Sequence, residues 1–323
     1  MIKKRKGDSI KEIIDIRNRR QWGNRHDELR NRLNSLERAF KKKDTLDSEF
    51  LRYFPISLVA CIESYFRHAI QEFIDHGEPY FENCSELLKN NDNFNFEVIK
   101  ALQGNKISVG EFISHLVPIN NLSNIDATMS TLIKDNYLKR VETVCNDWDR
   151  RQKGITIPII ENPAEVYKSV AKIFELRHIF CHEFASSITV LSEEIDQLFN
   201  DTLVFIKACE ELNGQILHPN APLTQREMTE QADNEFRSYD DQMKELNLQF
   251  LEKIKDEDSK IEYSKAHESW LDYRKHYAEF IALRNRGGTI WPMVYAKEMS
   301  CITYSHIQVL VREIKNYGYP DNY

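Results

Sequence analysis

The chain has 323 residues, of which 41% are hydrophobic and 29% charged, so it is long enough for two average domains or one large one. No run of about 18 apolar residues occurs, which excludes a membrane-spanning helix. The net charge of −7 is unevenly placed, because residues 1–43 hold 15 Lys or Arg against 6 Asp or Glu.

That basic N-terminal segment lacks the apolar stretch of a signal peptide, and we expect a cytoplasmic protein. A basic arm on an acidic body is compatible with guiding RNA, but a solvated helical face would have the same composition. The six cysteines are widely spaced and contain no C-x-x-C pair. They are therefore expected to be buried free thiols, not a disulfide framework.

Helical periodicity recurs along the chain, and glycine and proline are scarce, so we predict an all-α fold. Residues 9–43 are expected to form one or two charged helices, and residues 54–77 a core helix that ends at a glycine. A short helix should begin after Ser108 with Glu111 completing a capping box, and another should span 124–132. The segment RQKGITIPIIENP predicts an extended loop.

Pro163, capped by Asn162, should begin the next helix, and a helix over about 187–212 should follow it. The segment NGQILHPNAPLTQ has the composition of a linker. Three further helices are predicted near 224–255, 258–284 and 292–317. We thus expect a basic helical arm (1–44), a helical domain (45–213) and a smaller helical domain (214–323).

The stretch FELRHIFCHEFA, in the middle of the chain, gathers candidate catalytic residues. His178 and His182 are four apart and share a helix face, whereas Arg177 and His182 are five apart, roughly 140° around the axis. One helix therefore does not close an Arg–His pair, but a two-fold dimer could bring two of each into one cleft. In such a cleft histidine would move protons and arginine would hold the scissile phosphate of RNA without a metal.

Two other interpretations of this stretch stay open. The histidines with Cys181 or Glu183 could ligate zinc, although the H-E-x-x-H order is absent. The side chains could equally buttress a helix beside the core, with Cys181 as a small buried neighbour. The residues by themselves do not decide between a catalytic cluster and such a structural role.

The same stretch resembles the signature of the HEPN superfamily, in which an arginine and a polar residue precede a histidine. The segments ISLVACIESYFRHAI and ISVGEFISHLVPINNLSNIDATMSTLI also resemble bacterial HEPN proteins, so the likeness covers about residues 45–212. It implies a four- to five-helix bundle that dimerises through the motif helices. His182 would be the general acid/base, Arg177 the phosphate-stabilising residue, His178 an auxiliary group, and Glu63 a candidate for orienting Arg177.

The resemblance further implies a metal-independent endoribonuclease without a cofactor, of the kind found in toxins and phage defence, which leaves a 2′,3′-cyclic phosphate. The alternative is a non-enzymatic binding protein: a HEPN scaffold, a nucleotide-binding module, or an inhibitor or sensor that acts through the C-terminal domain.

The C-terminal hundred residues resemble an LprI-type lysozyme-inhibitor domain over about 222–315, a three- to four-helix unit. The matching residues are Leu246, Asn247, Ala266, Trp270, Tyr273, Arg274, Gly287, Gly288, Cys301, Thr303 and Leu310. Trp270, Tyr273 and Tyr277 share a helix face and are expected in the core. Tyr277 and Gln231 stand where cysteines are common in that family and His306 where arginine is common, so Cys301 should lack a disulfide partner. We expect a module that binds a protein ligand or trigger.

Overall fold

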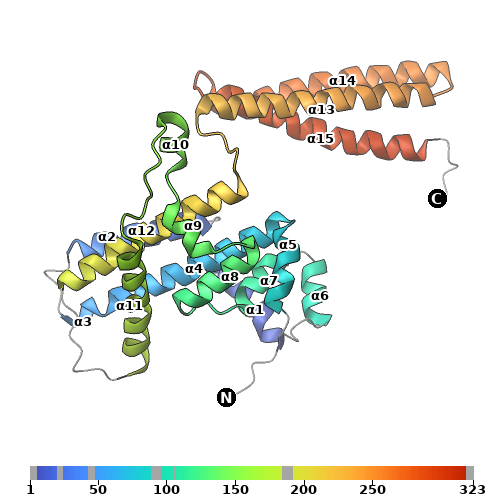
Figure 1. Cartoon of the computed structure of the whole chain (residues 1–323). Coiled ribbons are helices and arrows are strands. Elements are labelled where there is room, and N and C mark those ends of the chain that lie inside the picture. Colours follow the sequence, from blue (N-terminus) through green and yellow to red (C-terminus); the bar gives the residue numbers. More distant parts are fainter. Residues whose placement is uncertain are drawn as a thin grey trace. The chain divides into compact units, whose positions relative to one another are not determined.

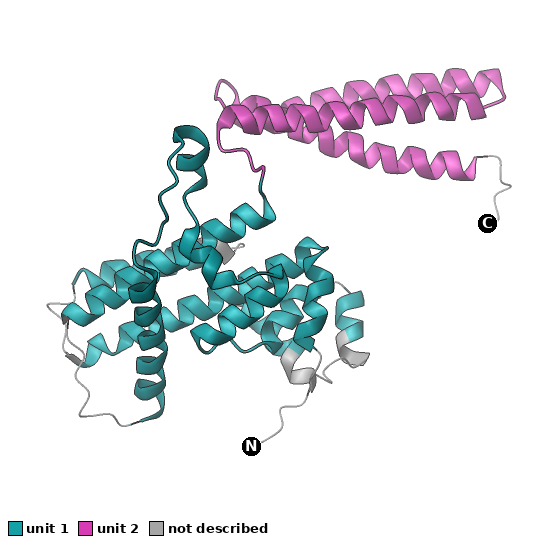
Figure 2. Ribbon diagram, in the orientation of Figure 1, with its two compact units in different colours: residues 1–219 teal, residues 220–323 magenta. Residues whose placement is uncertain are grey.

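The computed structural model describes residues 6–19, 25–42, 48–88, 96–104, 106–183 and 192–317, and it is all-α in these ranges (Figure 1). The chain divides into two compact units, residues 1–219 and residues 220–323 (Figure 2). None of the described helices is long and apolar enough to cross a membrane.

Unit 1 is a bundle around the long central helix α4 (Tyr53–His76). Its other helices are α1 (Lys6–Asn18), α2 (Arg25–Phe40), α3 (Ser48–Leu51), α5 (Tyr80–Asn83), the 3-10 helix η2 (Cys84–Leu88), α6 (Phe96–Gln103), α7 (Val109–Leu116), α8 (Leu122–Ile133), α9 (Tyr137–Thr143), α10 (Asp147–Lys153), α11 (Pro163–His182) and α12 (Ser192–Leu217). Helix α4 packs against α2, α7, α11 and α12. The expected loop after α10 pairs at Pro158 with Cys145, which precedes that helix, in an isolated antiparallel bridge.

The basic N-terminal helices pack into this bundle. Ile13 of α1 and Leu36 and Phe40 of α2 belong to the same buried cluster as the side chains of α4. Phe40 stacks on Phe199 of α12 with the ring centroids 4.5 Å apart. Removing the arm would therefore expose core, so a deletion cannot test separately whether its charge guides RNA.

A polar network crosses the centre of unit 1. The Tyr137 hydroxyl donates to Asn213 Oδ1 over 3.0 Å, and Asn213 Nδ2 donates to the Tyr65 hydroxyl oxygen over 2.9 Å. These buried groups join α9, α12 and α4. Burial also raises the pKa of Tyr65 and Tyr137, which keeps both phenols protonated, with Tyr137 as the donor and Tyr65 as the acceptor in this network.

Helices α4 and α7 approach each other closely at Gly110. The Asp75 carboxylate accepts hydrogen bonds from the Gly110 backbone N–H and from the Ser108 hydroxyl. Ser108 caps α7 by accepting the Glu111 backbone N–H, as predicted, whereas the Glu111 carboxylate binds Arg17 of α1. A Cβ on Gly110 would lie 2.5 Å from the carbonyl oxygen of Gln71.

We expect Gly110→Ala to lower the free energy of unfolding by about 2 kcal/mol, because the new methyl group would push α7 away from the backbone of α4. Gly214→Ala in α12 is the matched control, since its Cβ would meet nothing within 4 Å. That change should stabilise the chain by about 0.5–1 kcal/mol through helix propensity. Urea unfolding measures both; equal effects would contradict the close approach.

Unit 2 consists of α13 (Gln225–Lys253), α14 (Glu257–Ala282), the 3-10 helix η3 (Leu283–Asn285) and α15 (Trp291–Asn316). These helices lie where the sequence predicted them. Thr224 and Glu227 form a complete capping box at the start of α13. Helix α15 packs along α13 and α14 around a small core that includes Met243, Phe250, Ile307 and Leu310.

Candidate functional site

The motif residues Arg177, His178 and His182 lie on the last turns of α11. Asn162 caps this helix, and Pro163 occupies its first turn, as expected. Arg177 is half-buried, whereas His178 and His182 are exposed. The two imidazole rings are neighbours, with their centroids 5.1 Å apart. The exposed histidines are thus accessible to a substrate or to another protein.

Helix α11 continues without interruption to His182, so Arg177 and His182 keep their five-residue offset of about 140°. A single copy of α11 therefore directs these two side chains to different sides. The expectation that Cys181 is a buried neighbour is wrong, because this thiol is exposed. Phe180, which lies between Arg177 and His182 in the sequence, packs against Arg52, whose guanidinium lies 5.4 Å from the Phe180 ring centroid.

The six cysteines are free, but only Cys61, Cys84 and Cys209 are buried. Burial raises the pKa of the Cys61 thiol to about 11, so this side chain stays a protonated apolar neighbour. Cys301 is exposed and free, as the loss of its partner cysteine predicted. Within the described part of the chain, no group of three or more His, Cys, Asp or Glu is placed to hold a metal ion.

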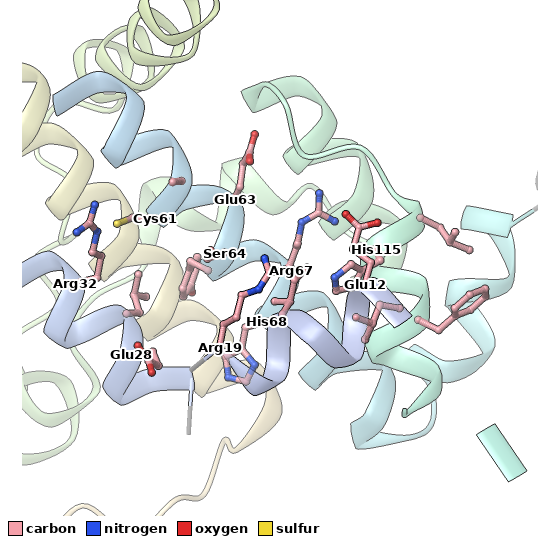
Figure 3. A pocket seen from close by; sticks show the side chains of 17 residues that line it. Glu12, Arg19, Glu28, Arg32, Cys61, Glu63, Ser64, Arg67, His68 and His115 are labelled. Atoms are coloured by element: carbon pink, nitrogen blue, oxygen red, sulfur yellow. The ribbon is translucent and has the colours of Figure 1, made fainter. Parts of the chain in front are cut away.

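Glu63 lines a cavity of about 710 Å³ between α1, α2, α4 and α7 (Figure 3). Its charged neighbour there is Arg67, whose pKa is lowered mainly by burial and raised in part by Glu63 and Glu12. Arg177 is not among the residues that line this cavity. The structure therefore places Glu63 beside Arg67 in this cavity, and the suggested role of Glu63 in orienting Arg177 stays a prediction.

A buried polar cluster lies inside unit 2. Arg274 of α14 donates through Nη1 to Asp240 Oδ1 of α13 over 2.6 Å and to Thr303 Oγ1 of α15 over 3.0 Å. Its guanidinium lies 5.3 Å from the Phe236 ring centroid and 5.0 Å from that of Trp270. One arginine thus connects the three helices, which explains why arginine stands at this position.

Residues 219–310 match the family model described as lysozyme inhibitor LprI. The C-terminal unit is therefore LprI-like, and Trp270, Arg274 and Thr303, which carried the resemblance in the sequence, meet in its interior. No curated protein and no solved structure matches the chain.

The LprI-like unit differs from expectation on one face of α14. Tyr273, Tyr277 and Phe280 are exposed by 54%, 38% and 65%, so the prediction that the two tyrosines belong to the core is wrong. Their rings follow one another along the helix, with centroid distances of 5.5 and 6.2 Å. Arg274 and Ala278, four residues apart, share the inward face of α14, and Tyr273 and Tyr277 lie about 100° around the helix from them, on its exposed side.

Two histidines of the LprI-like unit are stacked beside Arg274. His306 lies over Trp270 with a centroid distance of 3.9 Å, and the His267 ring lies 6.0 Å from that of His306. Burial, followed by the charges of His267 and Arg274, lowers the pKa of His306 to about 4. Burial and Arg274 also lower the pKa of His267, while Asp240 and Glu268 oppose that shift.

We expect the LprI-like unit to lose stability as the pH falls from about 6.5 to about 4. In this window unfolded His306 binds a proton that folded His306 does not, so protons favour the unfolded chain. Urea midpoints at several pH values, read by tryptophan fluorescence, measure the slope. His306→Gln should reduce it, and His276→Gln, at an exposed position of α14, should not; equal slopes in all three proteins would contradict the assignment.

Sequence reasoning missed both the cavity and the arginine cluster. The cavity depends on how α1 and α2 cover α4, and no local pattern encodes that packing. For the cluster a signal existed, since Arg274 lies in the middle of a helix, one turn after Trp270 and on the same side. An arginine one helical turn from a tryptophan can place its guanidinium over the aromatic ring, and a buried guanidinium requires a paired carboxylate.

Proposed function

We propose that the protein is a metal-independent endoribonuclease of the HEPN type that acts as a homodimer. The observation that carries this proposal is the exposure of His178 and His182 at the end of an uninterrupted α11, next to a half-buried Arg177. A solvent-facing His–Arg motif that one copy cannot close into a site fits a catalytic centre shared by two copies. A buttress for the core would instead direct these side chains inward.

In the proposed reaction His182 takes the proton of a ribose 2′-hydroxyl or protonates the leaving 5′-oxygen. Arg177 of the other copy holds the scissile phosphate and offsets the negative charge that develops on it. His178, beside His182 on the same face, orients substrate or the neighbouring imidazole. The products are a 2′,3′-cyclic phosphate and a 5′-hydroxyl end, and no water enters this step.

The test is cleavage of a mixed-sequence RNA by purified full-length protein in the presence of EDTA. We expect cuts with 2′,3′-cyclic phosphate ends and loss of cutting when the RNA carries 2′-O-methyl groups. A lack of cutting across RNA classes, or cutting of 2′-O-methyl RNA, would overturn the assignment. Cytoplasmic action as a toxin or defence effector belongs to the same proposal.

The LprI match favours a second candidate, binding of a protein through unit 2. The exposed aromatic row Tyr273, Tyr277 and Phe280 offers the large, rigid apolar area that protein interfaces use. Purified lysozyme is the probe that the family description suggests. Binding that weakens in Tyr277→Ser/Phe280→Ser would support an inhibitor-like role; no binding by the wild-type protein would contradict it, as would binding that the double variant leaves unchanged.

A further inference from the structure

The cavity between α1, α2, α4 and α7 has the dimensions of a small-molecule site. Its volume of about 710 Å³ falls within the roughly 300–1,000 Å³ typical of ligand pockets. The inner wall is apolar and consists of buried side chains from three of the helices: Ile13, Cys61, Tyr65 and Phe112. Apolar contact area is what such pockets supply to the body of a ligand.

Polar groups reach the cavity from several helices. Arg19 follows α1, Arg67 and His68 lie on α4, and His115 lies on α7 (Figure 3). Arg67 Nη1 donates to the Ser114 carbonyl oxygen over 2.6 Å, and a guanidinium has about five N–H donors. His115 Nδ1 lies 3.0 Å from the Glu111 carbonyl oxygen, which fixes the orientation of its ring. Carbonyl groups of α7 therefore hold Arg67 and His115 in place.

The wall formed by α1 is also fixed. The Arg17 guanidinium pairs with the Glu111 carboxylate of α7, whose side chain is only 4% exposed. A buried carboxylate paired across two helices holds the N-terminal helix against the bundle. The cavity is therefore bounded on this side by a clamped helix.

The partly buried guanidinium of Arg67 favours an anionic ligand group beside it. Burial lowers the pKa of this guanidinium, which means that its charge is partly desolvated. Three arginines and three glutamates line the cavity: Arg19, Arg32 and Arg67, with Glu12, Glu28 and Glu63. Glu12 and Glu63 offset the desolvation of Arg67 only in part, and both Glu12 and Glu28 have further interactions of their own. An anion that binds Arg67 would replace the missing solvation, and Arg19 adds a second positive charge nearby.

We propose that this cavity binds a small amphipathic anion, whose apolar body lies on the inner wall and whose carboxylate or phosphate contacts Arg67. Such an anion could be an aliphatic carboxylate or a nucleoside monophosphate. The site is separate from Arg177 and His182, so the inference is independent of RNA cleavage and extends beyond it.

Calorimetric titration of the full-length protein tests this with octanoate and adenosine monophosphate, each against its neutral counterpart, octanol or adenosine. We expect one of the anions to bind one to one and at least about tenfold more tightly than its counterpart. The anion that binds more tightly shows whether the ligand group is a carboxylate on an aliphatic chain or a nucleotide phosphate. Octylamine, the cationic analogue, should bind more weakly; stronger binding of the amine would overturn the assignment of charge.

Two variants localise the binding. Arg67→Gln should weaken the anion about tenfold or more, because it removes a charge-assisted contact. Ala60→Trp fills the cavity from α4 with a large ring and should abolish binding even if Arg67→Gln folds poorly. Arg140→Gln, an exposed arginine of α9 outside the cavity, should have no effect. Absence of binding by either anion, or binding unchanged in Ala60→Trp, would overturn the proposal.

Discussion

A one-to-one mixture of Arg177→Ala and His182→Ala proteins should recover about a quarter of the wild-type rate of RNA cleavage, although each variant alone should lose about a hundred- to ten-thousand-fold. The reason is the continuity of α11, which directs Arg177 and His182 to different sides of the helix in each copy. A site that takes arginine from one copy and histidine from the other is intact once in every mixed dimer.

The expected fraction follows from random reassortment. Half of the dimers in the mixture are mixed, and each has one intact site of two. Two controls test whether the recovered activity comes from mixed dimers. Mixing two tagged preparations of His182→Ala should restore nothing, and the double variant Arg177→Ala/His182→Ala mixed with either single variant should restore nothing. A mixture as inactive as its components would contradict the shared site, and activity that survives in both single variants would remove these residues from the mechanism.

Local signals predicted much of the fold. The caps at Ser108 and Asn162 form as expected, because a side-chain oxygen next to free backbone N–H groups determines where a helix begins. Gly77 ends α4 with a positive φ of 100°, a conformation that glycine adopts without a steric penalty. The three long helices of the LprI-like unit follow from periodicity between clear breaks.

What the sequence did not predict depends on which neighbours a helix meets. The Glu111 carboxylate was expected to complete a cap, but Arg17 of α1, far away in the chain, binds it. The spacing of Tyr273 and Tyr277 resembles a buried aromatic stripe and predicts that they lie in the core. In the structure Arg274 takes the inward position, and both tyrosines are exposed. For the motif, the sequence predicted its place on a helix, and the structure of one copy shows Arg177 and His182 on different sides of that helix.

The second large effect concerns Arg274, and we expect Arg274→Met to lower the free energy of unfolding of the LprI-like unit by about 2–4 kcal/mol. The Arg274 side chain is 9% exposed. Its loss removes two hydrogen bonds and the contacts of the guanidinium with the rings of Phe236 and Trp270. Asp240 keeps Lys244 as a partner at 2.7 Å, which limits the penalty of the unpaired carboxylate. Arg274→Lys keeps the charge without the planar fork and should fall in between.

The double variant Arg274→Met/Asp240→Leu separates two explanations for that loss. If most of it comes from stranding the Asp240 carboxylate, the double variant should be more stable than Arg274→Met, since two apolar side chains can replace a buried pair at little cost. If it comes instead from the stacking on Trp270, the double variant should recover nothing. Urea unfolding of the full chain, followed by tryptophan fluorescence, measures both. Because Lys244 already pairs with Asp240, we expect the double variant to recover less than half of the lost free energy of unfolding. If the free energy of unfolding of Arg274→Met lies within about 0.5 kcal/mol of the wild-type value, the arginine is not what joins the three helices.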